Sequence, residues 1–315
     1  LTSTLWGGAG KDSLFIDDDV TGVTISGGGS SATTDDGDDT IRISGSFVSS
    51  LAQGNAGNDT LYIGGKVNAS TARAGACNDT LSFAASVTGS TIYGDKGSDT
   101  LHLTGGTVEN SLIRGGSNTD TTNDSSDSIS LNVAVTSSSL MGEAGNDTIA
   151  LGAVAAKATS IYGGKGNDSV LQGASTFSTG YIAGDLGNDT ISLAATSLYG
   201  ATVYGDNATT SGGDDSINLQ AATATQKTSV YGGKGNDSIY GGNNDASLYL
   251  TNYLQGNAGN DSLVFKGSAV SSSVHGGAGN DTIYVGMSGS GASVSNLVRG
   301  DLGNDNISIG HAYGA

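Results

Sequence analysis

The feature that most constrains this chain is a six-residue pattern that recurs along its whole length. Its clearest copy is Gly-Gly-Ala-Gly-Asn-Asp at 276–281, which Thr-Ile-Tyr-Val follows. Several steps between copies, such as the one from Asp59 to Asp79, are 20 residues long, and insertions explain the longer steps. The last residue of the pattern is an aspartate in fourteen copies, at Asp12, Asp39, Asp59, Asp79, Asp99, Asp127, Asp147, Asp168, Asp189, Asp215, Asp237, Asp261, Asp281 and Asp305. Because a fixed period indicates a repeat array, we expect residues 1–315 to form a single repeat domain, part of a longer array.

Two apolar columns accompany the pattern. An aliphatic residue stands two positions after each of these aspartates, as Leu61 and Ile283 do. A second aliphatic column stands two positions before the first glycine, as at Ile92 and Val274. The residues around both columns alternate between apolar and polar, which favours short strands. A period of about 20 residues is too short for a helical repeat, so the sequence predicts an all-β parallel β-solenoid of about 14 coils.

The composition supports a narrow solenoid and excludes several partners. The 315 residues include 53 Gly and no Pro, and only 36% of them are hydrophobic. The net charge of −18 argues against nucleic acid and anionic membrane surfaces, since both require clustered Lys and Arg. The longest nearly apolar run, 149–156, is far too short to span a membrane. We therefore expect no nucleic-acid partner and no membrane insertion, and we expect any targeting signal to be removed or to lie outside this sequence.

The repeated loop has the chemistry of a cation site. Glycine adopts the left-handed backbone angles that turn carbonyl groups inward, and the final aspartate adds a carboxylate. Oxygen ligands of this kind select a hard cation such as Ca²⁺. Stacked coils place the aspartates in one row, where carboxylates about 5 Å apart repel by roughly 1 kcal/mol per pair in water and about 3 kcal/mol at an effective dielectric constant of about 20. Summed over the row, this repulsion equals or exceeds the stability of a typical domain, about 5 to 15 kcal/mol, so we expect the stack to require cations.

The pattern resembles the calcium-binding nonapeptide of the repeats-in-toxin (RTX) family, because Gly-Gly-x-Gly-Asn-Asp is followed by x-aliphatic-x over nearly the entire chain. In that family, the carbonyls and the aspartate of one loop bind Ca²⁺ together with the matching loop of the next coil. The family's β-roll carries a loop on both edges, whereas this chain has one loop per coil. The resemblance therefore implies a half β-roll with a single calcium row of roughly ten or more ions along one edge.

Carried over position by position, the resemblance assigns calcium ligands to individual loop residues. They are Gly7, Gly8, Gly10, Asp12, Asp39, Gly54, Asn55, Gly57, Asp59, Gly94, Asp95, Gly97, Asp99, Asp127, Gly142, Glu143, Gly145, Asp147, Gly163, Gly164, Gly166, Asp168, Gly184, Asp185, Gly187, Asp189, Asp206, Asp215, Gly232, Gly233, Gly235, Asp237, Gly256, Asn257, Gly259, Asp261, Gly276, Gly277, Gly279, Asp281, Gly300, Asp301, Gly303 and Asp305. Several loops depart from the pattern, and these departures lead to separate expectations.

In some loops an acidic residue or an asparagine replaces the second glycine, as at Asp95 and Asn257. Such a residue could add an oxygen ligand or be a tolerated surface residue. The loop 74–79 lacks the first and fourth glycines, and Cys77 stands at the fourth position. Because a side chain at a left-handed position costs about 1 to 2 kcal/mol, we expect calcium to be weakest or absent around Asp79. We interpret Cys77 as a tolerated substitution.

Two further features have more than one interpretation. Insertions at 30–38, 117–126 and 207–214 are rich in oxygen ligands, and they are extra cation sites, lateral contacts or solvated excursions. An outward column immediately before the loops contains aromatic and basic residues, which could bind sugar rings or a neighbouring molecule. We favour the interpretation that they cover the loop edge and stack on one another. This column consists of Trp6, Arg73, Tyr93, Arg114, Tyr162, Tyr204, Tyr231, His275 and Arg299.

The repeat array and the absence of a catalytic constellation favour a scaffold rather than an enzyme. We expect a secreted, extracellular, calcium-dependent structural module of a bacterial surface layer, surface filament or large RTX protein, which associates with itself into a sheet or filament. The alternative is a binding module at the cell surface, either an adhesin for surface polysaccharide or an ice binder, although the arc opposite the loops is irregular for a threonine array. A β-helical polysaccharide-modifying enzyme would need a nonrepeating cluster of basic and aromatic residues, which the sequence does not show.

Overall fold

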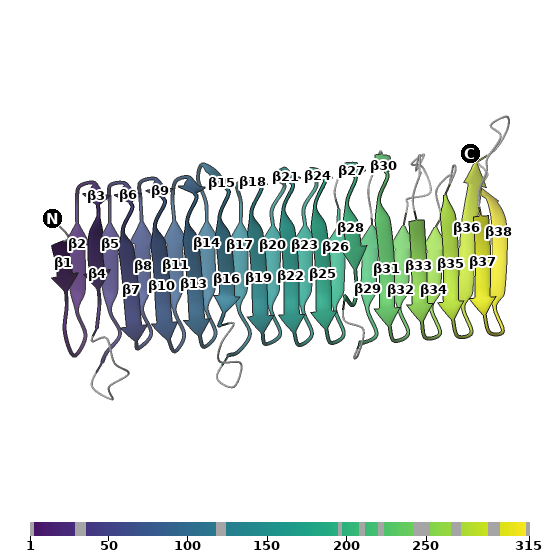
Figure 1. Cartoon of the computed structure of the whole chain (residues 1–315), viewed down its shortest axis with the longest axis horizontal. Helices are drawn as coiled ribbons and strands as arrows, with labels where there is room; N and C mark the ends of the chain where they lie inside the picture. Colours follow the sequence, from purple (N-terminus) through teal and green to yellow (C-terminus); the bar gives the residue numbers. More distant parts are fainter. Residues whose placement is uncertain are drawn as a thin grey trace. The chain divides into compact units, whose positions relative to one another are not determined.

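The computed structural model describes residues 3–28, 36–117, 124–194, 197–207, 212–219, 224–241, 253–265, 272–288 and 297–312. The chain divides into two compact units, residues 1–152 and 153–315, and each unit is described by itself. The described residues of both units form strands and no helix. Figure 1 shows that the strands of each unit lie side by side in successive coils of the chain.

In the first unit, each complete coil contributes one strand to each of three sheets. The first sheet contains, in order, β1 (Ser3–Trp6), β4 (Val23–Ser26), β7 (Leu51–Ala56), β10 (Thr71–Ala76), β13 (Thr91–Lys96), β16 (Leu112–Gly116) and β19 (Ser139–Ala144). The second contains β2 (Ser13–Ile16), β5 (Thr40–Ile43), β8 (Thr60–Ile63), β11 (Thr80–Phe83), β14 (Thr100–Leu103), β17 (Ser128–Leu131) and β20 (Thr148–Leu151). The third contains β3 (Val20–Thr21), β6 (Phe47–Val48), β9 (Val67–Asn68), β12 (Val87–Thr88), β15 (Thr107–Glu109) and β18 (Ala134–Thr136).

The second unit repeats this arrangement. Its first sheet contains β22 (Ser160–Lys165), β25 (Tyr181–Leu186), β28 (Thr202–Tyr204), β31 (Ser229–Lys234), β33 (Tyr253–Ala258), β35 (Ser273–Ala278) and β37 (Leu297–Leu302). Its second sheet contains β23 (Ser169–Gln172), β26 (Thr190–Leu193), β29 (Ser216–Leu219), β32 (Ser238–Gly241), β34 (Ser262–Phe265), β36 (Thr282–Ser288) and β38 (Asn306–Ala312). Its third sheet contains β21 (Ala156–Lys157), β24 (Thr176–Ser178), β27 (Ser197–Tyr199) and β30 (Ala224–Gln226).

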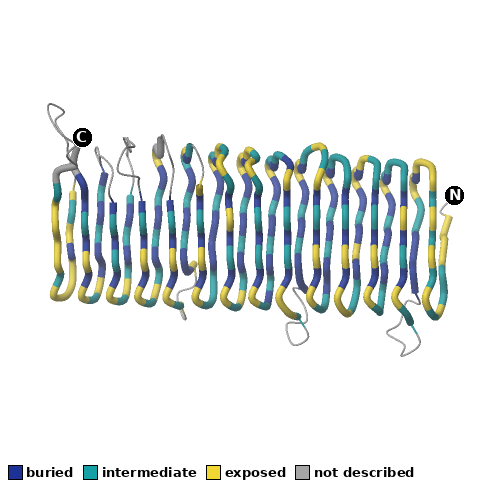
Figure 2. Tube along the Cα trace, turned by 180° about the vertical axis from the view of Figure 1, so that it is seen from behind, coloured by how far each residue is buried: buried dark blue, intermediate teal, exposed yellow. Residues whose placement is uncertain are grey.

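Both predicted apolar columns lie inside the coils, and strand pairing is parallel. Leu61 pairs with Leu81, and Leu81 pairs with Leu101, and all three side chains are buried. Ile92 pairs with Ile113 in the same way on the first sheet. Figure 2 shows the resulting alternation of buried and more exposed residues along the strands. The predicted all-β parallel β-solenoid is therefore confirmed.

The third sheet is a feature that the sequence analysis did not predict, since it expected two strands per repeat. Each of its strands from β3 to β27 buries a single residue, so the sequence shows an isolated apolar residue rather than an alternating run. Val67 pairs with Val87, and both are fully buried. In the first unit, serines next to the corner add a second ladder, because the Ser50 N–H donates to Ser70 Oγ at 3.1 Å and the Ser70 N–H donates to Ser90 Oγ at 3.1 Å.

Candidate calcium-binding edge

The candidate site is the edge where a first-sheet strand turns into a second-sheet strand, which is the lower edge of the view in Figure 1. The loop backbone is left-handed at the second and fourth positions of the pattern, with φ of 120° at Gly277 and 142° at Gly279. Parallel stacking in register brings the loops of neighbouring coils together within each unit. Asn257 pairs with Gly277, and Gly277 pairs with Asp301.

The first oxygen of each loop aspartate joins its coil to the preceding coil. The Asp39 N–H donates to Asp59 Oδ1 at 2.7 Å, and the Asp261 N–H donates to Asp281 Oδ1 at 2.8 Å. The same bond joins Asp12 to Asp39, Asp59 to Asp79, Asp79 to Asp99, Asp99 to Asp127 and Asp127 to Asp147 in the first unit. In the second unit it joins Asp168 to Asp189, Asp189 to Asp215, Asp215 to Asp237, Asp237 to Asp261 and Asp281 to Asp305. The predicted row of aspartates is therefore formed within each unit.

The second carboxylate oxygen of most of these aspartates is buried without a hydrogen-bond partner. This holds for Oδ2 of Asp12, Asp39, Asp59, Asp79, Asp99 and Asp127 in the first unit, and of Asp189, Asp215, Asp237, Asp261 and Asp281 in the second. A buried acceptor that lacks a partner loses its hydration without compensation. One such oxygen would be a local defect, but a regular row of them indicates that the partner is a ligand.

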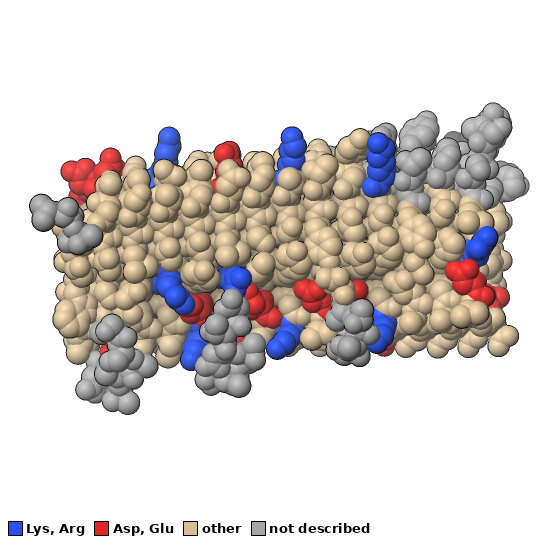
Figure 3. Space-filling model, in the orientation of Figure 1, with Lys and Arg blue, Asp and Glu red and all other residues tan. Residues whose placement is uncertain are grey.

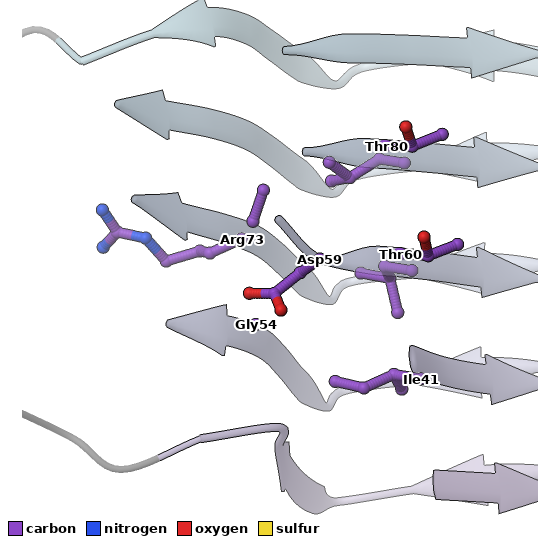
Figure 4. A pocket seen from close by; sticks show the side chains of 9 residues that line it. Ile41, Gly54, Asp59, Thr60, Arg73 and Thr80 are labelled. Atoms are coloured by element: carbon purple, nitrogen blue, oxygen red, sulfur yellow. The ribbon is translucent and has the colours of Figure 1, made fainter. Parts of the chain in front are cut away.

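The glycine at the first loop position leaves room beside this oxygen. A Cβ placed on Gly256 would collide with Asp261 Oδ2 and would stand 2.6 Å from the Gly276 carbonyl oxygen of the next coil. Gly54 has the same surroundings, formed by Asp59 Oδ2 and the Ala74 carbonyl oxygen. Figure 4 shows the Asp59 carboxylate directed toward Gly54, while the Arg73 side chain extends away from it. The space that glycine leaves therefore faces a carboxylate oxygen and a carbonyl oxygen.

The surroundings of the row raise the pKa of its carboxyl groups. Burial is the main cause, and the charges of neighbouring acidic residues add to it. The pKa rises to about 7 for Asp59 and Asp99, and to about 9 for Asp79, Asp127 and Asp215. The backbone N–H donor of the preceding aspartate opposes the shift. Ionisation of the whole row at neutral pH therefore requires positive charge from another source.

The donor set fits calcium. In the described ranges, no group of three or more His, Cys, Asp or Glu side chains could hold a metal ion, so backbone carbonyls would have to supply much of the coordination. Carboxylate and carbonyl oxygens without sulfur or imidazole suit a hard cation of large and flexible coordination number, which describes Ca²⁺. The residues that would hold it are the loop aspartates, through Oδ2, and the carbonyl-bearing glycines that face them.

Most acidic side chains at the second loop position contact a basic side chain of the preceding coil rather than the aspartate row. Asp95 accepts a hydrogen bond from Arg73 Nε at 2.9 Å. Glu143 lies 3.0 Å from Arg114, and Asp301 lies 3.0 Å from His275 Nδ1. Asn55 Nδ2 donates instead to Ser26 Oγ and to the Gly28 carbonyl. A direct ligand role for these side chains stays a prediction, and their observed partners lie in the preceding coil rather than in the aspartate row.

The loop 74–79 keeps the aspartate but changes its surroundings. Cys77 is exposed and has a φ of 90°, so a side chain occupies a left-handed position as expected. Ala74 is buried, and its methyl group stands where other loops leave space. Asp79 Oδ1 nevertheless accepts the Asp59 N–H, and Asp79 Oδ2 is buried without a partner. Weak or absent calcium at this loop therefore stays a prediction.

The three insertions lie partly outside the described residues, at 29–35, 118–123 and 208–211. Two aspartates in their described parts, Asp36 and Asp124, lie beside loop glycines, as does Asp206, which directly precedes the third insertion. Asp206 is among the predicted ligands, whereas Asp36 and Asp124 are not. A carboxylate inside an insertion has no fixed position in the repeat, so spacing alone gives no signal for it.

The outward column differs from its predicted composition in the second unit. Ring contacts run from Tyr162 through Tyr181, Tyr204, Tyr231 and Tyr253 to His275, with centroids 4.6 to 5.6 Å apart. Tyr181 and Tyr253 were not among the predicted members, because they stand two positions earlier in their repeats and share the outward face of the strand. Figure 3 shows that many basic and acidic side chains on the face it draws gather close to the loop edge.

Comparisons with known proteins agree with this site. The family model described as the RTX calcium-binding nonapeptide repeat (4 copies) matches residues 51–65, 90–108, 138–153, 160–171, 229–245, 250–264 and 266–287. Among curated proteins, none matches the chain significantly. A similar solved structure is the X-ray crystal structure of a hyperactive, Ca²⁺-dependent, β-helical antifreeze protein from an Antarctic bacterium, with a TM-score of 0.53 and 20% identity over 84% of this chain and 72% of that chain. At this identity the likeness supports the β-helical fold, and the matched repeats indicate calcium binding.

Proposed function

We propose that this chain is a calcium-dependent structural module of an extracellular assembly, such as a bacterial surface layer, a surface filament or a large secreted RTX protein. The observation that carries the proposal is the row of buried aspartate Oδ2 atoms without hydrogen-bond partners. A bound cation supplies the missing partner and neutralises the row. The solenoid and its RTX repeats resemble structural or binding proteins rather than enzymes.

The chain's own residues explain how calcium would rigidify the coils. Each loop aspartate already holds the preceding coil through Oδ1, and its Oδ2 faces the carbonyl of the following coil, as Asp261 faces Gly276. The oxygens that would hold a cation belong to two successive coils, and its charge would offset the repulsion between successive carboxylates. Bound calcium supplies positive charge and oxygen coordination, while the loops supply the geometry.

An extracellular location fits this requirement. Sites in extracellular modules have dissociation constants of about 10⁻⁴ to 10⁻³ M, which millimolar calcium outside cells fills. RTX repeats are typical of secreted proteins. Within the described residues, no helix has the length and apolar character needed to span a membrane.

The test is far-ultraviolet circular dichroism of the full chain during a calcium titration, followed by excess chelator. We expect the β signal to increase with calcium and to be lost on chelation. A full β signal without calcium would overturn the proposal. Sedimentation over the same titration tests self-association, and a chain that gains β structure while staying monomeric would limit calcium to folding.

A second candidate function is ice binding, which one feature of the second sheet favours. Thr40, Thr60, Thr80 and Thr100 pair in register on β5, β8, β11 and β14, and Thr60, Thr80 and Thr100 are exposed. A regular column of threonines about 4.8 Å apart is an ordered array of hydroxyl and methyl groups. Outside these coils the column contains serines, such as Ser128 and Ser216.

Thermal hysteresis of calcium-loaded protein tests this alternative. We expect Thr80→Tyr to abolish hysteresis if the column contacts ice, while Thr190→Tyr, at the same repeat position in the second unit, leaves it unchanged. Absence of hysteresis in the unmodified protein would exclude ice binding and leave the structural module intact.

A further inference from the structure

The three loops with insertions share a break in the pairing of the first sheet. In an ordinary loop the pairing of neighbouring coils continues into the pattern, since Asn55 pairs with Gly75 and Ala56 pairs with Ala76. In each coil that carries an insertion, the first-sheet strand stops pairing with the next coil before the loop begins. The last pairs are Ser26 with Gln53, Arg114 with Met141 and Tyr204 with Tyr231. The next coil therefore loses backbone acceptors at its own loop.

An aspartate carboxylate replaces the lost backbone acceptor in all three places. The Ala56 N–H donates to Asp36 Oδ2 at 3.3 Å. The Ala144 N–H donates to the Asp124 carboxylate, and the Lys234 N–H donates to the Asp206 carboxylate. All three donors stand at the third position of the following loop. At these three places, a carboxylate with two oxygens therefore replaces a neutral backbone carbonyl as the acceptor.

Asp36 and Asp206 each have one carboxylate oxygen, Oδ1, that is buried without a hydrogen-bond partner, and of these two residues only Asp206 is buried as a whole. Asp206 is 4% exposed, and its Oδ1 is buried without a hydrogen-bond partner. Its Oδ2 accepts the Gly213 N–H at 2.9 Å. Asp124 differs, because its Oδ2 accepts the Ser117 N–H at 3.0 Å and its Oδ1 accepts the Ser125 N–H at 3.2 Å. A buried carboxylate oxygen that no protein group satisfies can be satisfied by a bound cation.

The loop aspartate of the same coil presents a second unsatisfied oxygen. Asp215 is 2% exposed, and its Oδ2 is also buried without a partner. A Cβ on Gly205 would collide with Asp215 Oδ2 and with the Gly232 carbonyl oxygen. A Cβ on Gly212 would collide with Asp206 Oδ2 and would stand 2.5 Å from the Lys234 carbonyl oxygen. The loop therefore brings two carboxylates and two carbonyl oxygens of the next coil to the same edge.

We propose that Asp206 and Asp215 together form a two-carboxylate calcium site that fills at lower calcium concentration than the sites of the row with a single carboxylate. The proposal rests on the calcium-dependent function proposed above. It follows from ligand charge, because an additional carboxylate strengthens the attraction for a divalent cation and calcium affinity increases with ligand charge and rigidity. The insertion produces the site by replacing neutral backbone with an acidic side chain.

Asp185 provides a matched control, since it occupies the same second position of the pattern one coil earlier in the second unit. Its φ is 78°, a left-handed angle that asparagine also adopts. Asp206 is not among the residues with positive φ. The side chains of Asp185 and Asp206 therefore leave the backbone in different directions. The same substitution at the two positions compares one carboxylate inside the proposed site with one outside it.

The experiment measures calcium bound to the full chain by equilibrium dialysis across a range of free calcium, for the unmodified protein, Asp206→Asn and Asp185→Asn. We expect Asp206→Asn to lose about one ion at low free calcium, with an affinity lowered about tenfold or more at that site. Asp185→Asn removes an equal charge, and we expect it to lower calcium binding less than Asp206→Asn does. Identical isotherms for the two variants would overturn the proposal.

If the proposed calcium-dependent function is wrong, the dialysis gives a different result, because the unmodified protein then binds no calcium at all. If Asp206→Asn does not fold in excess calcium, Asp206→Glu replaces it. The longer side chain keeps the charge and displaces the carboxylate, so we expect a folded protein that is weakened at the same site. An unchanged isotherm for Asp206→Glu would then count against the proposal.

Discussion

The outward face of the first sheet differs between the two units, although both have the same coils and loops. In the first unit, basic side chains pair with acidic ones of the next coil, as Arg73 does with Asp95 and Arg114 with Glu143. In the second unit, six rings from Tyr162 to His275 form one continuous ladder. Since two different chemistries cover equivalent strands, the outward face does not determine the fold. The aspartate row and the buried columns, which the units share, are the determinants.

The largest expected effect is that calcium removal unfolds both units, so that their different outward faces no longer matter. Hydrogen exchange on the full chain should show protected strands in both units with calcium, and loss of protection in both after chelation. The reason is that each unit contains buried Oδ2 atoms without partners, such as those of Asp59 and Asp237. Protection that survives chelation in the second unit alone would show that the aromatic ladder, rather than the row, holds that unit together.

A pH titration without calcium should give the next largest effect. The folded pKa values of the row are raised, to about 7 at Asp59 and about 9 at Asp215, above the ordinary value of 3.8. A raised acid pKa means that the folded state favours the protonated group. Its stabilising contribution is fully present below about pH 4 and is lost as pH rises through about 7 to 9.

Calcium-free protein should therefore regain structure at pH 5, where the row is protonated, and resist urea better there than at pH 9, as measured by denaturation midpoints. With saturating calcium the difference between the two urea midpoints should disappear or reverse, because protons and calcium compete for the same oxygens. Equal midpoints at the two pH values without calcium would contradict the burial of the row.

The ladder itself should contribute a smaller, local amount. Tyr204 contacts Tyr181 at 5.6 Å and Tyr231 at 4.6 Å between ring centroids. Aromatic pairs contribute about 0.5 to 1.5 kcal/mol each, so Tyr204→Ala should lower the free energy of unfolding by about 1 to 3 kcal/mol in calcium. The matched change in the first unit is Arg73→Ala, whose partly exposed pair should contribute about 0 to 1 kcal/mol.

Urea denaturation of both variants in the same buffer separates the two contributions. Added salt should reduce the effect of Arg73→Ala and leave that of Tyr204→Ala unchanged, because salt screens exposed charges. Equal losses for the two variants would remove the energetic distinction between the faces.

The smallest expected effect concerns the fourth loop position. In the second unit this position is glycine in every described loop, whereas the first unit has Cys77 with a φ of 90°. Cys77→Gly removes a strain of about 1 to 2 kcal/mol, and the flexibility of glycine in the unfolded chain offsets about 0.5 to 1 kcal/mol of the gain. We expect a stabilisation of up to about 1.5 kcal/mol in urea denaturation with calcium, and destabilisation would show that the thiol makes a favourable contact.

The sequence was sufficient to predict the solenoid, because every repeat carries an aliphatic residue two positions after its aspartate. That periodic constraint fixes which side chains are buried, as Leu61, Leu81 and Leu101 illustrate. The third sheet escaped prediction because one buried residue per strand, such as Val87, leaves no alternation to detect. The row of aspartates was also predictable. The different roles of the two carboxylate oxygens were not, because whether Oδ1 reaches the N–H of the preceding coil depends on the spacing between coils.

Nonrepeating features were the hardest to anticipate. Asp36 and Asp124 lie in insertions, where no spacing rule assigns a side chain to the row. Asp95 and Glu143 stand at a repeat position, yet Arg73 and Arg114 draw their carboxylates to the outward face. The direction of such a side chain depends on its partner in the neighbouring coil, and this partner is known only when the register of one coil on the next is known.

The hydrogen bond from each aspartate N–H to the carboxylate of the following coil gives the row a polarity. The loop containing Asp59 is fastened by Asp79, which comes later in the chain, and it in turn fastens the loop containing Asp39. A coil that emerges first during synthesis is thus fastened only when its successor has emerged. Closure of the loops consequently trails the growing end by one coil, and removing a coil should loosen the loop before it more than the loop after it.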